Sequence, residues 1–209
     1  FSERLIKLSR IPINYSIPKR HKSNFNLSDL NLPDKYFLIG IPHSAVKFHP
    51  DFDHILDRIL EEIPHAFLFF VESSKKFRTE RLKERWSKNS KLIISRTIFH
   101  PRVSLNDFLE LVKCFDIMLD PLYFGMGNTF YQAAACGTPV VSMPTNKFQS
   151  RGAFAAYKQM LIHDAPIANS QNEYISIAKR LEIDTSYREN ISKQMFVNSR
   201  EYLFDDKTI

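Results

Sequence analysis

The sequence has few cysteines, few glycines and no long apolar run. Its 209 residues include two cysteines and five glycines. Because Cys114 and Cys136 form no CxxC or Cys/His pattern, we expect reduced thiols, as in a cytoplasmic protein, rather than a disulfide framework. No apolar run approaches the ~18 residues of a membrane-spanning helix. The seven histidines have no metal-ligand spacing, so we expect no metal site.

A strong nucleic-acid signal is also missing, although the chain is basic. The net charge is +6, and the isoelectric point is about 9.3. The basic residues are spread along the chain, and the densest stretch, residues 75–91, alternates in sign as a solvated helix does. Without a stripe of basic and aromatic residues, a nucleic-acid-binding domain is disfavoured. The excess charge also suits a small ligand that carries phosphate.

The N-terminal region differs from the rest of the chain. Residues 1–35 contain three prolines that interrupt any helix, so we interpret them as an irregular N-terminal arm or linker. Residues 36–209 have a regular pattern and predict one domain. The chain starts at Phe1 with no visible leader segment, so we expect a piece of a longer protein.

Short apolar runs alternate with amphipathic segments along the domain. The runs expected to be buried strands cover residues 36–41, 66–71, 91–99, 116–121 and 140–144. The segments with helical spacing cover residues 51–63, 77–89, 105–115, 128–136, 151–162, 171–182 and 186–203. Alternation of this kind predicts an α/β fold, a doubly wound parallel sheet with helices on both faces.

In such sheets ligands bind beyond the carboxyl ends of the strands, where the strand order reverses, so the loops after the strands are the candidate site. Lys47 lies in the loop after the first strand, where its ammonium is either a mobile charge for a phosphate or an ordinary surface group. Arg102 and Val103 lie in the loop 99–104, which either presents backbone groups to a flat base or is a plain connection.

The loop 124–129 is the strongest signal. Gly125 and Gly127 lack side chains, so a ligand can approach the backbone closely. Asn128 is a favourable N-cap, and Thr129 adds a hydroxyl group in the first helical turn. The unpaired N–H groups and the positive end of the helix dipole favour a diphosphate there. A tight turn with a normal cap is the alternative.

Gln132 follows Thr129 by about one turn and lies on nearly the same helix face. Its amide is suited to a hydrogen bond with a ribose or sugar hydroxyl. A polar side chain on the exposed face of the helix is the equally simple alternative.

Three stretches together resemble a known family. They are KFHPDFD at 47–53, DIMLDPLYFGMGNTFYQAAACGTPVVSMP at 116–144 and FQSRGAFAAYKQM at 148–160, with weaker similarity at 1–5 and 199–206. In this order they resemble the C-terminal catalytic half of the O-GlcNAc transferase family, which includes bacterial relatives that carry tetratricopeptide repeats.

The resemblance implies the second, Rossmann-like lobe of a GT-B glycosyltransferase. Such enzymes bind UDP-GlcNAc, or UDP-glucose in some relatives, between two lobes and move the sugar to a protein side chain without a metal. The UDP-sugar is then a donor substrate and no cofactor is implied. The protein acceptor is bound through the first lobe and the repeats, so we expect the isolated chain to be inactive. We also expect a cytoplasmic location and no membrane partner.

The resemblance also assigns roles by position. Lys47 matches the lysine that contacts the diphosphate and stabilises the leaving group, which is a catalytic role. Val103 matches a residue whose backbone contacts uracil. Asn128 and Thr129 match the pair that holds the phosphates at the helix start.

Two positions depart from the family pattern. Gln132 stands where an acidic residue usually binds a hydroxyl group, and an amide accepts that hydrogen bond less strongly. A glutamine usually precedes the lysine, and the candidates here are His43 and Ser44. These departures leave open an alternative, a catalytically degenerate nucleotide-binding or scaffolding module.

Overall fold

The computed structural model describes residues 8, 10–13, 15–19 and 22–204. The weak family similarity expected at residues 1–5 lies outside the described residues, as does the end of the 199–206 stretch.

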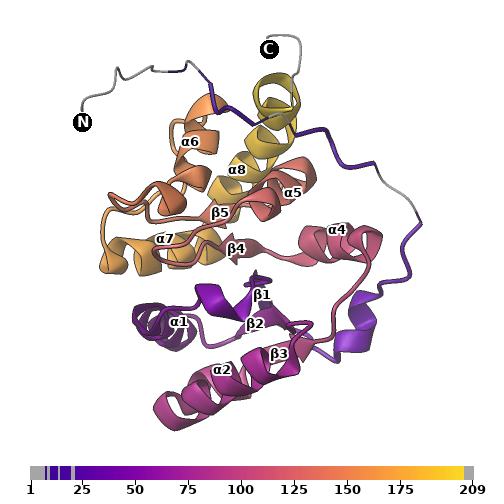
Figure 1. The fold of residues 1–209 in the computed structure, drawn as a ribbon, viewed down its shortest axis with the longest axis vertical. Coiled ribbons are helices and arrows are strands. Elements are labelled where there is room, and N and C mark those ends of the chain that lie inside the picture. Colours follow the sequence, from indigo (N-terminus) through magenta and orange to yellow (C-terminus); the bar gives the residue numbers. More distant parts are fainter. Residues whose placement is uncertain (1–7, 9, 14, 20–21, 205–209) are drawn as a thin grey trace.

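A parallel five-stranded sheet forms the centre of the domain (Figure 1). Its order is β3-β2-β1-β4-β5, and every neighbouring pair is parallel. The strands are β1 Phe37–Gly40, β2 Ala66–Val71, β3 Thr97–His100, β4 Ile117–Leu119 and β5 Val140–Val141. The expected doubly wound sheet is therefore confirmed, and the direction of winding reverses between β1 and β4.

Helices cover the sheet. They are α1 Pro50–Glu62, α2 Lys76–Asn89, α3 Lys91–Ser95, α4 Leu105–Cys114, α5 Asn128–Cys136, α6 Gly152–Gln159, α7 Gln171–Ile183 and α8 Thr185–Asn198, with short turns η1 Leu27–Leu30, η2 Ala45–Lys47, η3 Phe148–Ser150 and η4 Ser199–Leu203. Helix α1 packs against α3 and α7, α4 packs against α5, and α8 contacts both α5 and α7. Among the described residues, no helix combines the length and apolar character that crossing a membrane demands.

The third strand is shorter than expected. The run 91–99 was predicted as one strand, but its first five residues form α3 and only Thr97–His100 is extended. The hydroxyl of Ser90 accepts a hydrogen bond from the Ile93 amide at 3.1 Å, which caps this helical turn. A short apolar run with no clear period fits a buried helix as well as a strand, so the prediction was wrong there.

Helix α1 is fixed to the core and to α2. Phe52 and Ile55 on its apolar face are at most 1 % exposed, and burial of a side chain of this size contributes about 2 kcal/mol. On its other side, Asp53 accepts hydrogen bonds from the Arg85 guanidinium and the Trp86 indole, both at 2.8 Å. Arg85 also donates to the Phe48 carbonyl at 2.9 Å. The loop between β1 and α1 is therefore fixed by its contacts with α2.

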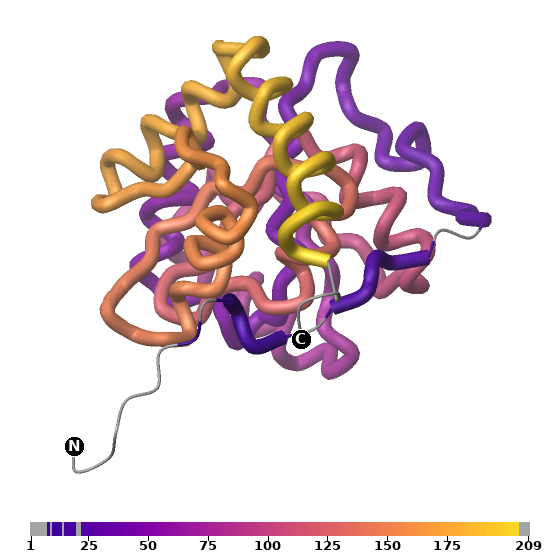
Figure 2. Tube along the Cα trace, turned by 90° about the horizontal axis from the view of Figure 1, so that it is seen from above, coloured from indigo at the N-terminus to yellow at the C-terminus, as the bar shows by residue number. Residues whose placement is uncertain are grey.

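The described part of the N-terminal arm, residues 10–13, 15–19 and 22–35, lies along the domain and passes the end of the last helix (Figure 2). Tyr15 stacks on Tyr131 of α5 with ring centroids 4.8 Å apart. The Ser23 hydroxyl donates to Asp107 of α4 at 2.8 Å. Hydrogen bonds from Ser23 and then from Ser104 lower the pKa of Asp107 to about 2. The arm thus packs on α4 and α5.

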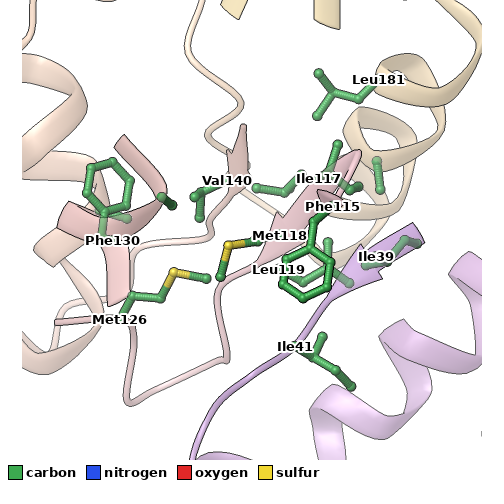
Figure 3. Packing of buried hydrophobic residues seen from close by; sticks show 14 of the residues in the cluster. Ile39, Ile41, Phe115, Ile117, Met118, Leu119, Met126, Phe130, Val140 and Leu181 are labelled. Atoms are coloured by element: carbon green, nitrogen blue, oxygen red, sulfur yellow. The ribbon is translucent and has the colours of Figure 1, made fainter. Parts of the chain in front are cut away.

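Helix α5 is anchored at both ends. Met126, just before it, and Phe130, in its first turn, are buried in the core beside Met118 (Figure 3). Gly137 ends the helix with φ of 78°, because a left-handed C-cap favours glycine. The start of this helix is consequently a fixed feature of the sheet edge.

Candidate functional site

The reversal between β1 and β4 brings two loops together at the carboxyl edge of the sheet. One loop follows β1 and leads to α1; the other follows β4 and leads to α5. The two loops start from adjacent strands and lead to helices on opposite faces of the sheet, which is where doubly wound proteins bind ligands.

Lys47 bridges these two loops. Its Nζ atom donates a hydrogen bond to the Gly125 carbonyl at 2.7 Å and lies 4.7 Å from the centroid of the Phe124 ring. Partial burial lowers the pKa of Lys47, an effect that the charge of Asp120 opposes. A half-buried cation therefore lies beside Gly125, which precedes the N-cap of α5 by two residues.

Asp120 fixes the loop between β4 and α5 through buried hydrogen bonds. The sequence analysis did not predict this role. Its side chain is 2 % exposed and accepts hydrogen bonds from the Met126 amide at 2.5 Å and from the Ser142 hydroxyl at 2.6 Å. Burial raises the pKa of Asp120 to about 6, although both hydrogen bonds oppose the rise. The available signal was its place at the end of β4.

The two glycines of the loop, Gly125 and Gly127, have different roles. A Cβ atom at Gly125 would lie 2.9 Å from the Asp120 carboxylate, so the missing side chain there makes room for Asp120. A Cβ atom at Gly127 would meet nothing within 4 Å. The expected open approach to the backbone is therefore found at Gly127.

The start of α5 differs by one residue from the expectation. Gly127 is the N-cap and Asn128 is the first helical residue, so the prediction of Asn128 as N-cap was wrong. No side chain caps this end, because glycine has none to offer. Asn128 is exposed and Thr129 is half-buried, and amides in a first helical turn have no partner within the helix.

A cavity of about 430 Å³ adjoins this end of the sheet. It collects five of the predicted residues: His43, Ser44, Arg102, Val103 and Gln132. The remaining lining residues, which the sequence analysis did not single out, are Pro42, Val71, Glu72, Ser73, Ser74, Arg78, Ser104, Leu105 and Phe108. Many of them follow β2, whose loop opens at the same edge, so the strand-end rule that located the other loops could have found them.

His43 forms a buried, neutral part of the cavity wall. The side chain is 4 % exposed, and its Nε2 donates to the Leu119 carbonyl at 2.9 Å. Burial lowers the pKa of His43 to about 3, so the imidazole carries no charge near neutral pH. Ser44 is exposed at the start of η2 and makes no capping hydrogen bond.

The predicted residues thus fall into two adjoining parts. His43, Ser44, Arg102, Val103 and Gln132 line the cavity, whereas Lys47 and the glycine-rich loop with Asn128 and Thr129 lie outside its wall. Gln132 belongs to the helix that starts at Asn128, so it connects the cavity with the helix end. In the described part of the chain, no three His, Cys, Asp or Glu side chains group as metal ligands would.

Comparisons with known proteins agree on one class of enzyme. The sequence profile of glycosyl transferase family 41 matches residues 28–209. The UDP-N-acetylglucosamine–peptide N-acetylglucosaminyltransferase of Caenorhabditis elegans is 25% identical over 179 residues, which are 84% of this chain and 15% of that protein.

Solved structures share the fold. A mutant O-GlcNAc transferase from Thermobaculum terrenum matches with a TM-score of 0.78 and 20% identity, over 95% of this chain and 37% of that chain. Anabaena HepE in complex with UDP-glucose matches with a TM-score of 0.61 and 17% identity, over 84% of this chain and 47% of that chain. The similar structures are GT-B glycosyltransferases, which confirms the expected fold class. This chain spans less than half the length of each of these relatives.

Proposed function

This chain belongs to glycosyl transferase family 41, and from that premise we propose that it is the lobe of a glycosyltransferase that holds UDP-GlcNAc or UDP-glucose. The observation that carries the proposal is the hydrogen bond from Lys47 to the Gly125 carbonyl, beside the uncapped start of α5. An ammonium group near a helix start whose first-turn amides have no side-chain cap is suited to a diphosphate.

The cavity suits the nucleoside. Its volume of about 430 Å³ lies in the usual range for small-ligand sites. We assign the uracil to the side formed by Arg102 and Val103, where backbone groups of the loop contact the base edge. Gln132 is assigned to a ribose hydroxyl, since it lies between the cavity and the helix end.

The proposed chemistry is displacement at the anomeric carbon of the sugar, with UDP as the leaving group. Negative charge grows on the diphosphate as the bond breaks. Lys47 stabilises that charge together with the first-turn amides at Asn128 and Thr129. The protein acceptor and the group that receives its proton belong to the other lobe of a GT-B enzyme, and repeats upstream of it select the acceptor. We place the parent protein in the cytoplasm.

Calorimetry on the 209-residue chain tests the nucleotide assignment. We expect UDP to bind with a Kd on the order of 0.1–1 mM, because half of a two-lobed cleft encloses only part of the ligand. ADP and uridine serve as controls for the base and for the diphosphate, and both should bind more weakly. Absence of UDP binding at several millimolar, or equal binding of ADP, would overturn the assignment.

A degenerate module that binds nucleotide without transferring sugar is the second candidate. Gln132 motivates it, because an amide stands where the family pattern has a carboxylate. Sugar transfer from UDP-GlcNAc or UDP-glucose to protein by the full-length parent separates the two functions, since a degenerate module gives nucleotide binding alone.

A further inference from the structure

Tyr123 has an unusual backbone conformation beside the proposed diphosphate site. Its φ angle is 65°, in the left-handed region that side chains with a Cβ atom rarely adopt. It is the centre of a tight turn in which the Phe124 amide donates to the Leu122 carbonyl at 2.7 Å. A bulky residue keeps this conformation only where its surroundings compensate the strain.

The compensation comes from the loop that follows β1. The Tyr123 hydroxyl donates to the Asp51 carboxylate at 2.7 Å. The ring edge packs against His49, with centroids 4.9 Å apart and an interplanar angle of 85°. The hydrogen bond to Asp51 also raises the pKa of Tyr123, so its hydroxyl stays a donor.

These contacts join the two loops that supply the diphosphate site. Asp51 follows Lys47 by four residues, in the first turn of the helix that the first loop leads to, and Tyr123 is two residues before Gly125 on the other loop. The Tyr123–Asp51 hydrogen bond is therefore a second link, parallel to the one between Lys47 and Gly125. Asp51 also lies in the first turn of α1, where any carboxylate is favourable, but that role does not require a tyrosine in a left-handed conformation.

We propose that Tyr123 and Asp51 are positioning residues that hold the glycine-rich loop against Lys47 for diphosphate binding. The inference rests on the proposed function. When the hydrogen bond is lost, Tyr123 relaxes toward a negative φ, and the turn that leads to Gly125 shifts relative to Lys47. The loss falls on the diphosphate, while the nucleoside cavity is left as it is.

The test compares binding of UDP and uridine to the 209-residue chain by calorimetry. The readout is the ratio of the uridine Kd to the UDP Kd, which isolates the diphosphate. Tyr123→Phe keeps the ring but removes the hydroxyl, and Asp51→Ala removes the acceptor. We expect each to lower the ratio about fivefold with the uridine Kd unchanged, and the double variant to lower it no further.

Asp51→Asn separates positioning from a helix-charge effect. Asparagine still accepts from the Tyr123 hydroxyl but carries no charge, so positioning predicts a ratio near that of the unmodified chain. Tyr187→Phe is the matched control, because the Tyr187 hydroxyl donates to the Asp164 carbonyl at 2.9 Å outside the proposed site. Its ratio should stay unchanged.

Each result decides the inference. If Tyr123→Phe, with a melting temperature near that of the unmodified chain, keeps the full ratio, positioning is wrong while the nucleotide assignment stands. If Asp51→Asn falls as far as Asp51→Ala, the carboxylate acts through its charge and the proposal is overturned. If the unmodified chain binds uridine as well as UDP, the proposed function fails first, and the inference fails with it.

Discussion

The ammonium of Lys47 lies 2.7 Å from the carbonyl oxygen of Gly125, although the two residues are 78 positions apart in the sequence. The contact exists because β1 and β4 are neighbours in the sheet while their following loops lead to opposite faces. It places a half-buried cation at the start of α5, where no side chain caps the helix. The proposed grip on a diphosphate follows from this relationship.

Lys47→Ala removes the cation from the site. We expect the UDP affinity of the chain to fall at least tenfold, which corresponds to about 1.4 kcal/mol, because the diphosphate loses its nearest ammonium. Calorimetry measures the change. Lys88→Ala is the control, since Lys88 is 69% exposed and pairs with Glu84 on α2; equal affinities for the two variants would remove Lys47 from the site.

Gln132→Glu restores the carboxylate of the family pattern. A charged acceptor makes a stronger hydrogen bond to a hydroxyl group than an amide does. We expect uridine binding to strengthen about threefold in this variant and to weaken in Gln132→Ala. Should both substitutions leave the uridine Kd unchanged, Gln132 makes no contact with the ribose.

Asp120→Asn changes how stability depends on pH. The pKa of Asp120 is about 6 in the folded protein, compared with an ordinary value of 3.8. The folded state thus retains a proton that the unfolded chain has released, and the resulting stability, present below about pH 4, is lost as the pH rises through about 6. Asparagine mimics the protonated carboxyl at every pH.

We therefore expect the free energy of unfolding of Asp120→Asn to rise relative to the unmodified chain between pH 4 and pH 7, by up to about 3 kcal/mol. Urea unfolding at several pH values measures this difference. A difference that does not vary with pH shows that Asp120 has an ordinary pKa.

Asp53→Ala breaks the ion pair between buried Asp53 and partly buried Arg85. The substitution leaves the guanidinium without its carboxylate and the Trp86 indole without an acceptor. We expect a loss of about 3 kcal/mol in the free energy of unfolding, measured in urea. Glu84→Ala, at a pair on the exposed face of α2, should cost less than ~1 kcal/mol. Similar costs for both would mean that the Asp53 pair is not buried in solution.

The fold and the positions of the loops that form the candidate site could be predicted from local patterns. The apolar runs predicted β1, β2, β4 and β5, and the segments with helical spacing predicted α4 and α7, which Ser104 and Ser170 cap in the structure. The resemblance to the O-GlcNAc transferase family is confirmed by the profile match and by the relatives in sequence and structure. Because ligands bind at strand ends in such sheets, the loops of Lys47 and Gly125 were both expected at the site, and the structure places them in contact.

What was missed depends on contacts that the pattern of apolar and polar residues does not specify. The helical turn at Lys91–Ser95 is chosen by its cap and by the burial of Ile93, which the apolar run alone does not specify. In the sequence, Asp120 is an ordinary residue at the end of a strand, and its role depends on hydrogen bonds from Met126 and Ser142 that the sequence does not show. The role of Gly125 could not be predicted either, because it depends on the position of the Asp120 carboxylate, which leaves no room for a Cβ atom at residue 125.

The most direct test of the central claim is an NMR titration of the ¹⁵N-labelled 209-residue chain with UDP. Binding of the diphosphate at the start of α5 predicts that the amide resonances of Gly127, Asn128 and Thr129 shift most, and that uridine shifts them far less. The claim is contradicted if saturating UDP leaves these three resonances in place, or if the largest shifts arise away from the carboxyl edge of the sheet.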